Sequence, residues 1–219
     1  MLPHRGYAVT FGDILMALDY IDTGYKTIFR VDNALDIEVC DQLYNFMIAN
    51  KLQSNPTDNV LPWFDDETYI PWDLDNINIK RQIVAYRKLV TQIVSEKFNQ
   101  TLYPEFTHLV LWRMGRQMPR HKDNGYEPND PLAARKVSCV TYLNDNFTGG
   151  ETFVANETGV DYVSKPVKGS VVCYLSDSTN EHGVNPVLLG NRVTMPIWFC
   201  DDIAKSEDIR LVDIIKSLS

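Results

Sequence analysis

The feature that most constrains the fold of this chain is a series of short β-rich runs that begins near residue 106. They read FTHLVLWRM, KVSCVTYL, ETFVA, SVVCYLS and RVTMPIWFC, and turn signals such as Gly149-Gly150 and Lys168-Gly169 separate them. Several short strands at this spacing predict a sandwich, a barrel or a jelly roll. A chain of 219 residues is long enough for one such domain with additional helices.

The first hundred residues differ in character, and we expect them to be mainly helical. Asp36 can cap a helix that runs through DIEVCDQLYNFMIAN, and residues 79–98 repeat apolar side chains at helical spacing. Residues 27–31 are a strand candidate. Between the two helices, residues 52–79 hold several acids and aromatic side chains but no Lys or Arg. At the other end of the chain, SEDIRLVDIIKSLS predicts a C-terminal helix.

Charge and cysteine usage narrow the function classes. A net charge of −8 disfavours binding to nucleic acid or to an anionic membrane surface. The four cysteines show no CxxC spacing and stand in apolar runs, which favours free thiols and a reducing, cytoplasmic setting. We expect no signal peptide, because the N-terminus lacks an uninterrupted apolar run. We also expect no membrane span.

Two of the four histidines stand where they can hold a metal. His121-Lys122-Asp123 is an H-x-D step, and on an extended segment residues i and i+2 point to the same side. His182 follows the run SVVCYLS. Two histidines and one carboxylate on one face form the ligand set of non-haem Fe(II) oxygenases, which leaves coordination positions open for a cosubstrate and O₂. A lone H-x-D is more often a surface loop or a capped turn.

Arg192 and Tyr142 are the candidates for holding a cosubstrate. Arg192 stands ten residues after His182 and can bind the remote carboxylate of a dicarboxylate bidentately. Tyr142 can donate its hydroxyl to the same carboxylate. The alternatives are that Arg192 pairs with an acid on the surface and that Tyr142 is a core residue.

On these residues the sequence resembles the prolyl 4-hydroxylase-like group of 2-oxoglutarate- and Fe(II)-dependent dioxygenases. The resemblance spans roughly residues 107–200 and rests on these motifs: His121-x-Asp123, Thr141-Tyr142-Leu143-Asn144, Phe147-x-Gly149-Gly150-Glu151-Thr152, Pro166-x-Lys168-Gly169, His182-Gly183-Val184-x-Pro186-Val187, Gly190-x-Arg192 and Trp198. Trp112 and Pro196 depart from it, because many relatives have a tyrosine and a threonine there. Thr194 is a possible substitute for that threonine.

The resemblance implies an α+β fold, with a double-stranded β-helix (jelly roll) core and flanking N-terminal helices. We expect a single catalytic domain over residues 1–219. Residues 1–100 would supply helical support and a substrate loop, residues 101–201 the core, and residues 202–219 the C-terminal helix. It also implies that His121, Asp123 and His182 bind Fe(II), and that Arg192 and Tyr142 bind 2-oxoglutarate.

The activity implied is hydroxylation of a prolyl residue in a peptide or protein, with O₂ consumed, 2-oxoglutarate decarboxylated to succinate, and ascorbate as the reductant. Lysyl hydroxylation, hydroxylation of a small molecule and a non-catalytic jelly-roll binding module are the alternatives. Nucleic-acid repair of the AlkB type is disfavoured by Trp198, which stands where that group has a second arginine. The H-x-D step, in place of H-x-H, disfavours a cupin-like isomerase.

Two segments bear on substrate choice. Residues 52–79 are either a solvated loop or an acidic surface that selects a basic peptide. Residues 122–136 form a second polar loop, directly after the first two ligands, which we interpret as a candidate lid. The short length fits a bacterial or viral protein.

Overall fold

The computed structural model describes residues 8–11, 14–50, 68–127, 130–156 and 158–218. Most of the acidic segment, residues 52–67, lies outside the described residues, so its predicted role in substrate selection stays a prediction. No helix among the described residues is long and apolar enough to span a membrane. The four cysteines are all free and buried.

The larger of the two main sheets has eight strands, and its pairings are antiparallel. In spatial order its members are β3 (Asp19–Ile21), β4 (Ile28–Asp32), β13 (Val171–Leu175), β9 (Arg135–Tyr142), β16 (Arg192–Cys200), β7 (Leu109–Trp112) and β5 (Thr68–Tyr69), with β6 (Tyr103–Thr107) also paired to β16. Eight of the nine residues of β16 are buried, which fits a central strand covered on both faces.

The smaller sheet has four strands and carries part of the site. Its order is β12 (Tyr162–Ser164), β11 (Thr152–Val154), β14 (His182–Val184) and β8 (Met118–His121). Two further pairs are β10 (Thr148–Gly149) with β15 (Val187–Leu189) and β1 (Ala8–Phe11) with β2 (Ile14–Ala17). The antiparallel sheets and the flanking helices confirm the predicted α+β fold with a double-stranded β-helix core.

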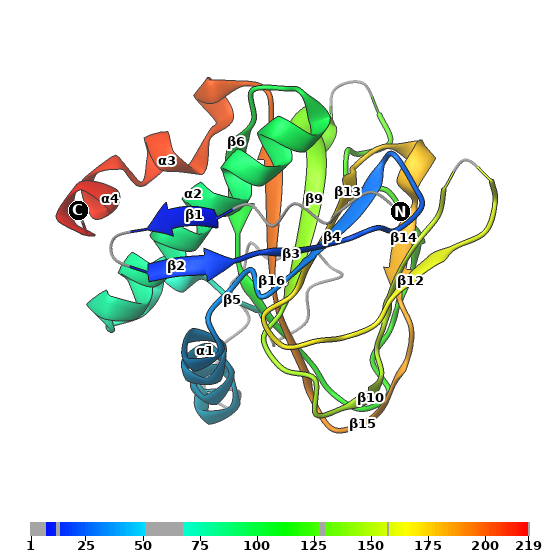
Figure 1. Ribbon diagram of the computed structural model, residues 1–219, viewed down its shortest axis with the longest axis horizontal. Helices are drawn as coiled ribbons and strands as arrows, with labels where there is room; N and C mark the ends of the chain where they lie inside the picture. The colour runs from blue at the N-terminus through cyan, green and yellow to red at the C-terminus, as the bar shows by residue number, and fades with distance from the viewer. Residues whose placement is uncertain (1–7, 12–13, 51–67, 128–129, 157, 219) are drawn as a thin grey trace.

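Helices cover the large sheet on the side away from the small one, as Figure 1 shows for α2, α3 and α4. The helices are α1 (Ile37–Asn50), α2 (Ile77–Phe98), α3 (Glu207–Arg210) and α4 (Val212–Leu218), with 3₁₀ turns at Pro71–Asp73, Pro131–Ala134, Ser178–Asn180 and Ile203–Lys205. Asp36 caps α1 as predicted, because its carboxylate accepts from the backbone N–H groups of Glu38 and Val39.

The described part of the first hundred residues is less helical than the sequence predicts. It contains five strands, and β3, β4 and β5 extend the large sheet, so the β-core is not confined to residues 101–201. β3, β4 and β5 are two to five residues long, too short for a clear alternating pattern. They form because β4 pairs with β13, β3 pairs with β4, and β5 pairs with β7. The C-terminal segment forms two short helices that meet at Leu211, rather than one.

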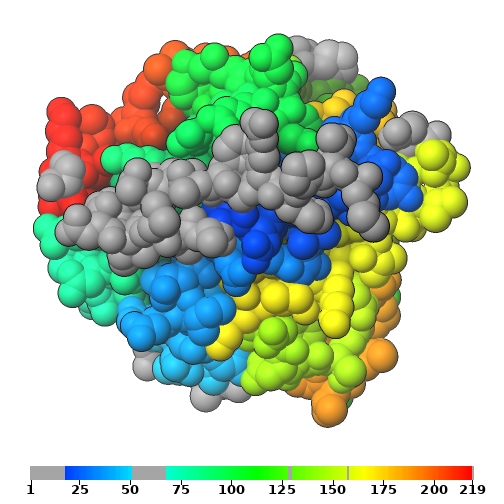
Figure 2. All heavy atoms as spheres, in the orientation of Figure 1, coloured from blue at the N-terminus to red at the C-terminus, as the bar shows by residue number. Residues whose placement is uncertain are grey.

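Segments far apart in the sequence are joined at the edge of the large sheet. The backbone N–H groups of Ala34 and Leu35 donate to the carbonyl of Gly169, and Arg30 donates to the carbonyl of Lys165. In Figure 2 the blue N-terminal segment accordingly lies against the yellow segment on the molecular surface. These contacts attach the N-terminal segment to the core.

A buried ionic cluster joins α2 to the C-terminal segment. The Glu207 carboxylate accepts from Trp72 Nε1 at 2.8 Å and from Thr107 Oγ1 at 2.8 Å, and it lies 3.1 Å from Arg87 Nη2. Arg87 also pairs with Asp208 at 2.7 Å. Burial raises the pKa of Glu207, although the positive charge of Arg87 acts in the opposite direction.

Candidate active site

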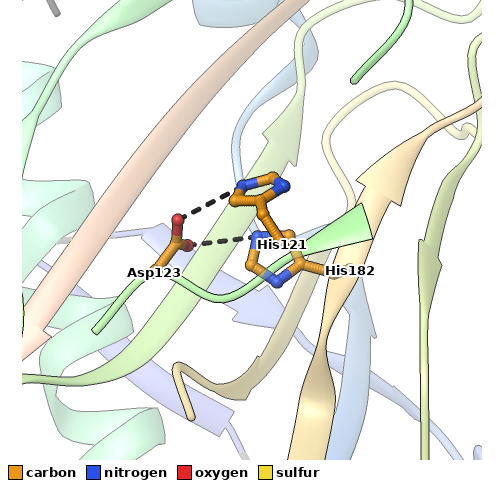
Figure 3. Close-up of side chains that lie close together, drawn as sticks. All are labelled: His121, Asp123 and His182. Atoms are coloured by element: carbon orange, nitrogen blue, oxygen red, sulfur yellow. Dashed lines mark ion pairs between the residues drawn. The ribbon is translucent and has the colours of Figure 1, made fainter. Parts of the chain in front are cut away.

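The three predicted ligands meet at one end of the small sheet. His182 on β14 is the direct partner of His121 on β8, and Asp123 follows β8 in the chain. Asp123 Oδ1 lies 3.5 Å from His121 Nε2, and Oδ2 lies 3.2 Å from His182 Nε2 (Figure 3). One ligand atom from each residue falls within 4.8 Å of the others. The backbone N–H of Asp123 donates to the carbonyl of Ser176, which ties this loop to the large sheet.

Backbone carbonyls orient both imidazoles. His121 Nδ1 lies 2.9 Å from the carbonyl oxygen of Pro119, and His182 Nδ1 lies 3.2 Å from that of Asn180. A carbonyl only accepts, so each Nδ1 carries the hydrogen and each neutral ring presents an Nε2 lone pair towards Asp123. Lone pairs that face a carboxylate repel it unless a proton or a cation lies between them. The donor set therefore fits a divalent metal.

The pKa shifts of Asp123 and His121 agree with a site that attracts positive charge. Burial alone raises the pKa of Asp123, but the charge of His182 and hydrogen bonds from His121 and His182 hold it well below its usual range. Burial lowers the pKa of His121, but hydrogen bonding and attraction to Asp123 outweigh this and raise it. A bound divalent ion would take the place of these protons.

A cavity between the two sheets extends from the three ligands to Arg192. The space inside it, counting the part open to solvent, is about 530 Å³. Both sheets contribute to its wall, which is lined by Val110, Trp112, Met118, His121, Asp123, Ser138, Cys139, Val140, Thr152, Tyr174, His182, Gly183, Val184, Arg192, Thr194, Pro196 and Trp198.

Arg192 is a buried cation in the wall of this cavity. Its side chain is 1% exposed, and its guanidinium donates to Thr152 Oγ1 at 3.1 Å and Thr194 Oγ1 at 3.4 Å. Within the part of the chain that the structure describes, no carboxylate forms an ion pair with it. The alternative that Arg192 pairs with a surface acid is therefore not supported. A buried cation without a counter-charge favours an anionic ligand.

The Trp112 indole is a further donor beside the Arg192 guanidinium. Trp112 is its direct partner across β7 and β16, with the guanidinium carbon 5.3 Å from the indole centroid. Trp112 Nε1 and Arg192 Nε are buried and have no hydrogen-bond partner among the described residues. Two donors without partners in the wall of one cavity suit a ligand with several acceptor oxygens.

Tyr142 lies behind this wall rather than in it. Its hydroxyl accepts from the backbone N–H of Thr152 at 3.0 Å and lies 2.9 Å from Thr152 Oγ1. Tyr174, which the sequence analysis did not single out, lines the cavity, and its ring centroid lies 4.5 Å from that of His182. Thr194, noted as a substitute for the missing threonine, also lines the cavity and contacts Arg192.

Comparison with known proteins agrees with this geometry. Residues 101–200 match the family described as the 2OG-Fe(II) oxygenase superfamily. The match covers a little under half of the chain. This likeness and the His-Asp-His triad together imply Fe(II) and 2-oxoglutarate.

The curated relatives include prolyl 3-hydroxylases. The chain is 32% identical to "Prolyl 3-hydroxylase 2" of Rattus norvegicus over 125 residues, which cover 48% of this chain and 18% of the relative. It is 35% identical to "Prolyl 3-hydroxylase 1" of Homo sapiens over 145 residues, which cover 56% and 20%. The chain thus spans about a fifth of the length of these relatives.

Solved structures with the same fold include two prolyl hydroxylases. A prolyl-4-hydroxylase of Pseudomonas putida superposes with a TM-score of 0.60 at 19% identity, covering 80% of this chain and 93% of that one. A prolyl hydroxylase of Trichoplax adhaerens, in complex with a hypoxia inducible factor peptide fragment, gives a TM-score of 0.65 at 16% identity, covering 81% and 85%. At this identity the likeness establishes the fold.

Proposed function

We propose that the chain is a 2-oxoglutarate- and Fe(II)-dependent dioxygenase that hydroxylates a prolyl residue in a peptide or protein. 2-Oxoglutarate would be converted to succinate and CO₂, and ascorbate would serve as reductant. The observation that carries the proposal is one cavity that contains a converging His-Asp-His triad and a buried arginine without a carboxylate partner among the described residues.

His121, Asp123 and His182 would hold the metal through His121 Nε2, His182 Nε2 and one carboxylate oxygen. When bound, Fe(II) supplies the site at which the 2-oxo acid chelates and O₂ is reduced. Arg192 holds the distal carboxylate of 2-oxoglutarate, assisted by the N–H of Trp112 and the hydroxyls of Thr152 and Thr194. Tyr142 acts through Thr152, which its hydroxyl contacts, and through Arg192, whose guanidinium carbon lies 5.4 Å from the centre of its ring. Val110 and Val184 add apolar side chains to the cavity wall.

The choice of a prolyl substrate is supported by the relatives. Those found by sequence are named prolyl 3-hydroxylases, whereas the solved structure from Pseudomonas putida is a prolyl-4-hydroxylase. The proposal therefore commits to proline and leaves the position on the ring to the experiment.

The test is a hydroxylation assay on the pure protein with Fe(II), ascorbate, O₂ and a panel of proline-rich and lysine-rich peptides. Mass spectrometry detects a one-oxygen gain, and omission of 2-oxoglutarate is the control. A cosubstrate-dependent gain on proline supports the proposal, and amino-acid analysis then separates 3- from 4-hydroxyproline. A gain on lysine, or succinate formation without a modified peptide, contradicts the prolyl assignment. If neither oxygen gain nor succinate appears, the non-catalytic binding module becomes the better reading.

A further inference from the structure

The two oxygens of the Asp123 carboxylate are not equivalent. Oδ2 accepts from Trp198 Nε1 at 2.7 Å and from Ser138 Oγ at 2.6 Å. A carboxylate oxygen has about two lone-pair sites, so these two donors occupy both of them. Oδ2 also lies 3.2 Å from His182 Nε2, whereas Oδ1 lies 3.5 Å from His121 Nε2. Both oxygens therefore face the imidazoles, but Trp198 and Ser138 both donate to Oδ2, so Oδ1 is the oxygen whose lone pairs are left for a metal.

The Trp198 indole that makes this contact is held by two neighbouring side chains. Trp198 lies on β16 between β6 and β9, and it is 6% exposed. The His108 ring stacks on it with centroids 4.8 Å apart and an interplanar angle of 12°. The Arg135 guanidinium, from β9, lies 4.1 Å from its centroid and is itself fixed by a 2.9 Å bond to Glu105. A ring stacked in this way cannot swing its N–H away from Asp123.

Ser138, the second donor, is also held in place. Ser138 is the partner of Trp198 in the pairing of β9 with β16, so both donors come from adjacent positions in one sheet. The Ser138 oxygen lies 2.7 Å from Ser176 Oγ, which can donate to it while Ser138 donates to Asp123. The backbone carbonyl of Ser176 receives the Asp123 N–H. Asp123 is thereby anchored through its backbone and through Oδ2.

We propose that Trp198, together with Ser138, is a positioning residue that engages Oδ2 of Asp123 and leaves Oδ1 as the only carboxylate atom for the metal. This inference rests on the proposed function. A carboxylate that bound through both oxygens would take one of the coordination positions that the cosubstrate and O₂ need. The two donors thus keep the third ligand monodentate.

The test compares Trp198→Phe, which keeps a stacked ring but removes the N–H, with wild type. Anaerobic calorimetry measures Fe(II) affinity without 2-oxoglutarate, and the visible spectrum of the Co(II) form reports coordination geometry. Loss of such a supporting hydrogen bond lowers metal affinity roughly 10–100-fold, so we expect a decrease in this range and a changed Co(II) spectrum. Ser138→Ala should act in the same direction. Trp72→Phe is the matched control, since it removes a buried indole N–H that donates to Glu207 rather than to Asp123, and it should keep wild-type Fe(II) affinity.

Each outcome has a distinct meaning. Fe(II) affinity of Trp198→Phe within threefold of wild type, with an unchanged Co(II) spectrum, overturns the inference and leaves the proposed function intact. Absence of Fe(II) binding by the wild-type protein overturns the proposed function itself. A variant that only lowers the thermal midpoint of the metal-free protein has a structural role alone, which also contradicts the inference. If Trp198→Phe does not fold, Ser138→Ala decides in its place.

Discussion

His182 lies directly opposite His121 across the pairing of β14 with β8, so one pair of adjacent strands presents both imidazoles to the same point. Side chains alternate between the faces of a strand, and a slip of one residue would turn His182 to the other face. The register of this strand pair is therefore a condition for the site.

The pairing of β14 with β8 leaves no room for a side chain at Gly183, so a substitution there should weaken metal binding. A Cβ at this position would clash with the Phe153 ring and with the carbonyl oxygen of Met118. In Gly183→Val we expect β14 to move away from β8 and Fe(II) affinity to fall at least tenfold. Calorimetry with Fe(II) is the measurement, and circular dichroism of the metal-free protein checks that it folds. Wild-type affinity in a folded Gly183→Val would show that the register tolerates the side chain.

Replacing Arg192 should reduce the affinity for 2-oxoglutarate without affecting the metal. Lysine is a point charge that cannot reproduce two parallel hydrogen bonds, so Arg192→Lys should bind 2-oxoglutarate about 10–100-fold more weakly. Arg192→Gln should bind it more weakly still. Titration of the Fe(II)-loaded protein under anaerobic conditions measures this, with Fe(II) affinity as the internal control. Equal affinity in Arg192→Lys would argue against a bidentate contact.

Substitutions of Trp112 and Tyr142 should differ in their effects on the affinity for 2-oxoglutarate. Trp112→Phe removes a donor in the cavity wall, so we expect roughly a five- to tenfold loss of 2-oxoglutarate affinity, equivalent to about 1 kcal/mol. Tyr142→Phe should change it less than threefold, because the hydroxyl contacts Thr152. The same anaerobic titration compares the two. A larger loss in Tyr142→Phe would restore the direct contact that the sequence predicts.

His108 should make the metal-free protein less stable at mildly acidic pH. Burial, assisted by the charge of Arg135, lowers its pKa to about 3. The unfolded chain takes up this proton near pH 6.5 and the folded chain does not, so its contribution to stability is complete above that pH and is lost as the pH falls towards 3. Between pH 6.5 and 5.0 the loss is roughly 2 kcal/mol.

Urea unfolding at pH 7.5, 6.5 and 5.0 tests this in wild type and in His108→Phe, which keeps a stacked ring. The free energy of unfolding of the variant should fall less over this interval. Parallel curves for the two proteins would mean that His108 titrates alike in the folded and unfolded states.

The free energy of unfolding should fall more when Arg87 is replaced than when the charge of the Glu207 carboxylate is removed. Arg87→Met leaves a buried carboxylate without its main cation, which costs about 3–5 kcal/mol at neutral pH. Glu207→Gln keeps hydrogen-bonding capacity towards Trp72 and Thr107 and should cost less. Since burial already raises the pKa of Glu207, protonation at pH 5 should relieve part of the cost in Arg87→Met. Urea unfolding at pH 7 and pH 5 measures both variants, and a cost of Arg87→Met that is independent of pH would contradict this account.

The sequence indicated which residues gather at the site better than it indicated how close each one lies to the cavity. His121, Asp123, His182 and Arg192 stand at strand ends with diagnostic spacing, and the structure brings them to one cavity. Tyr142 and Tyr174 both lie on strands of the large sheet, and a strand pattern indicates the face of a side chain but not its distance from a cavity. The bond from Trp198 to Asp123 joins residues 75 positions apart, a contact that no local pattern in one sequence indicates.

The pairing of β4 with β13 also has a consequence for how this protein folds. Its partners lie far apart in the sequence, around residues 30 and 172, so β4 can dock only after the intervening chain has collapsed. Topologies dominated by such distant contacts fold slowly. Until β4 arrives, the edge of β13 is an exposed template for another chain. Refolding at high protein concentration should therefore be limited by aggregation through this edge, in competition with closure of the sheet.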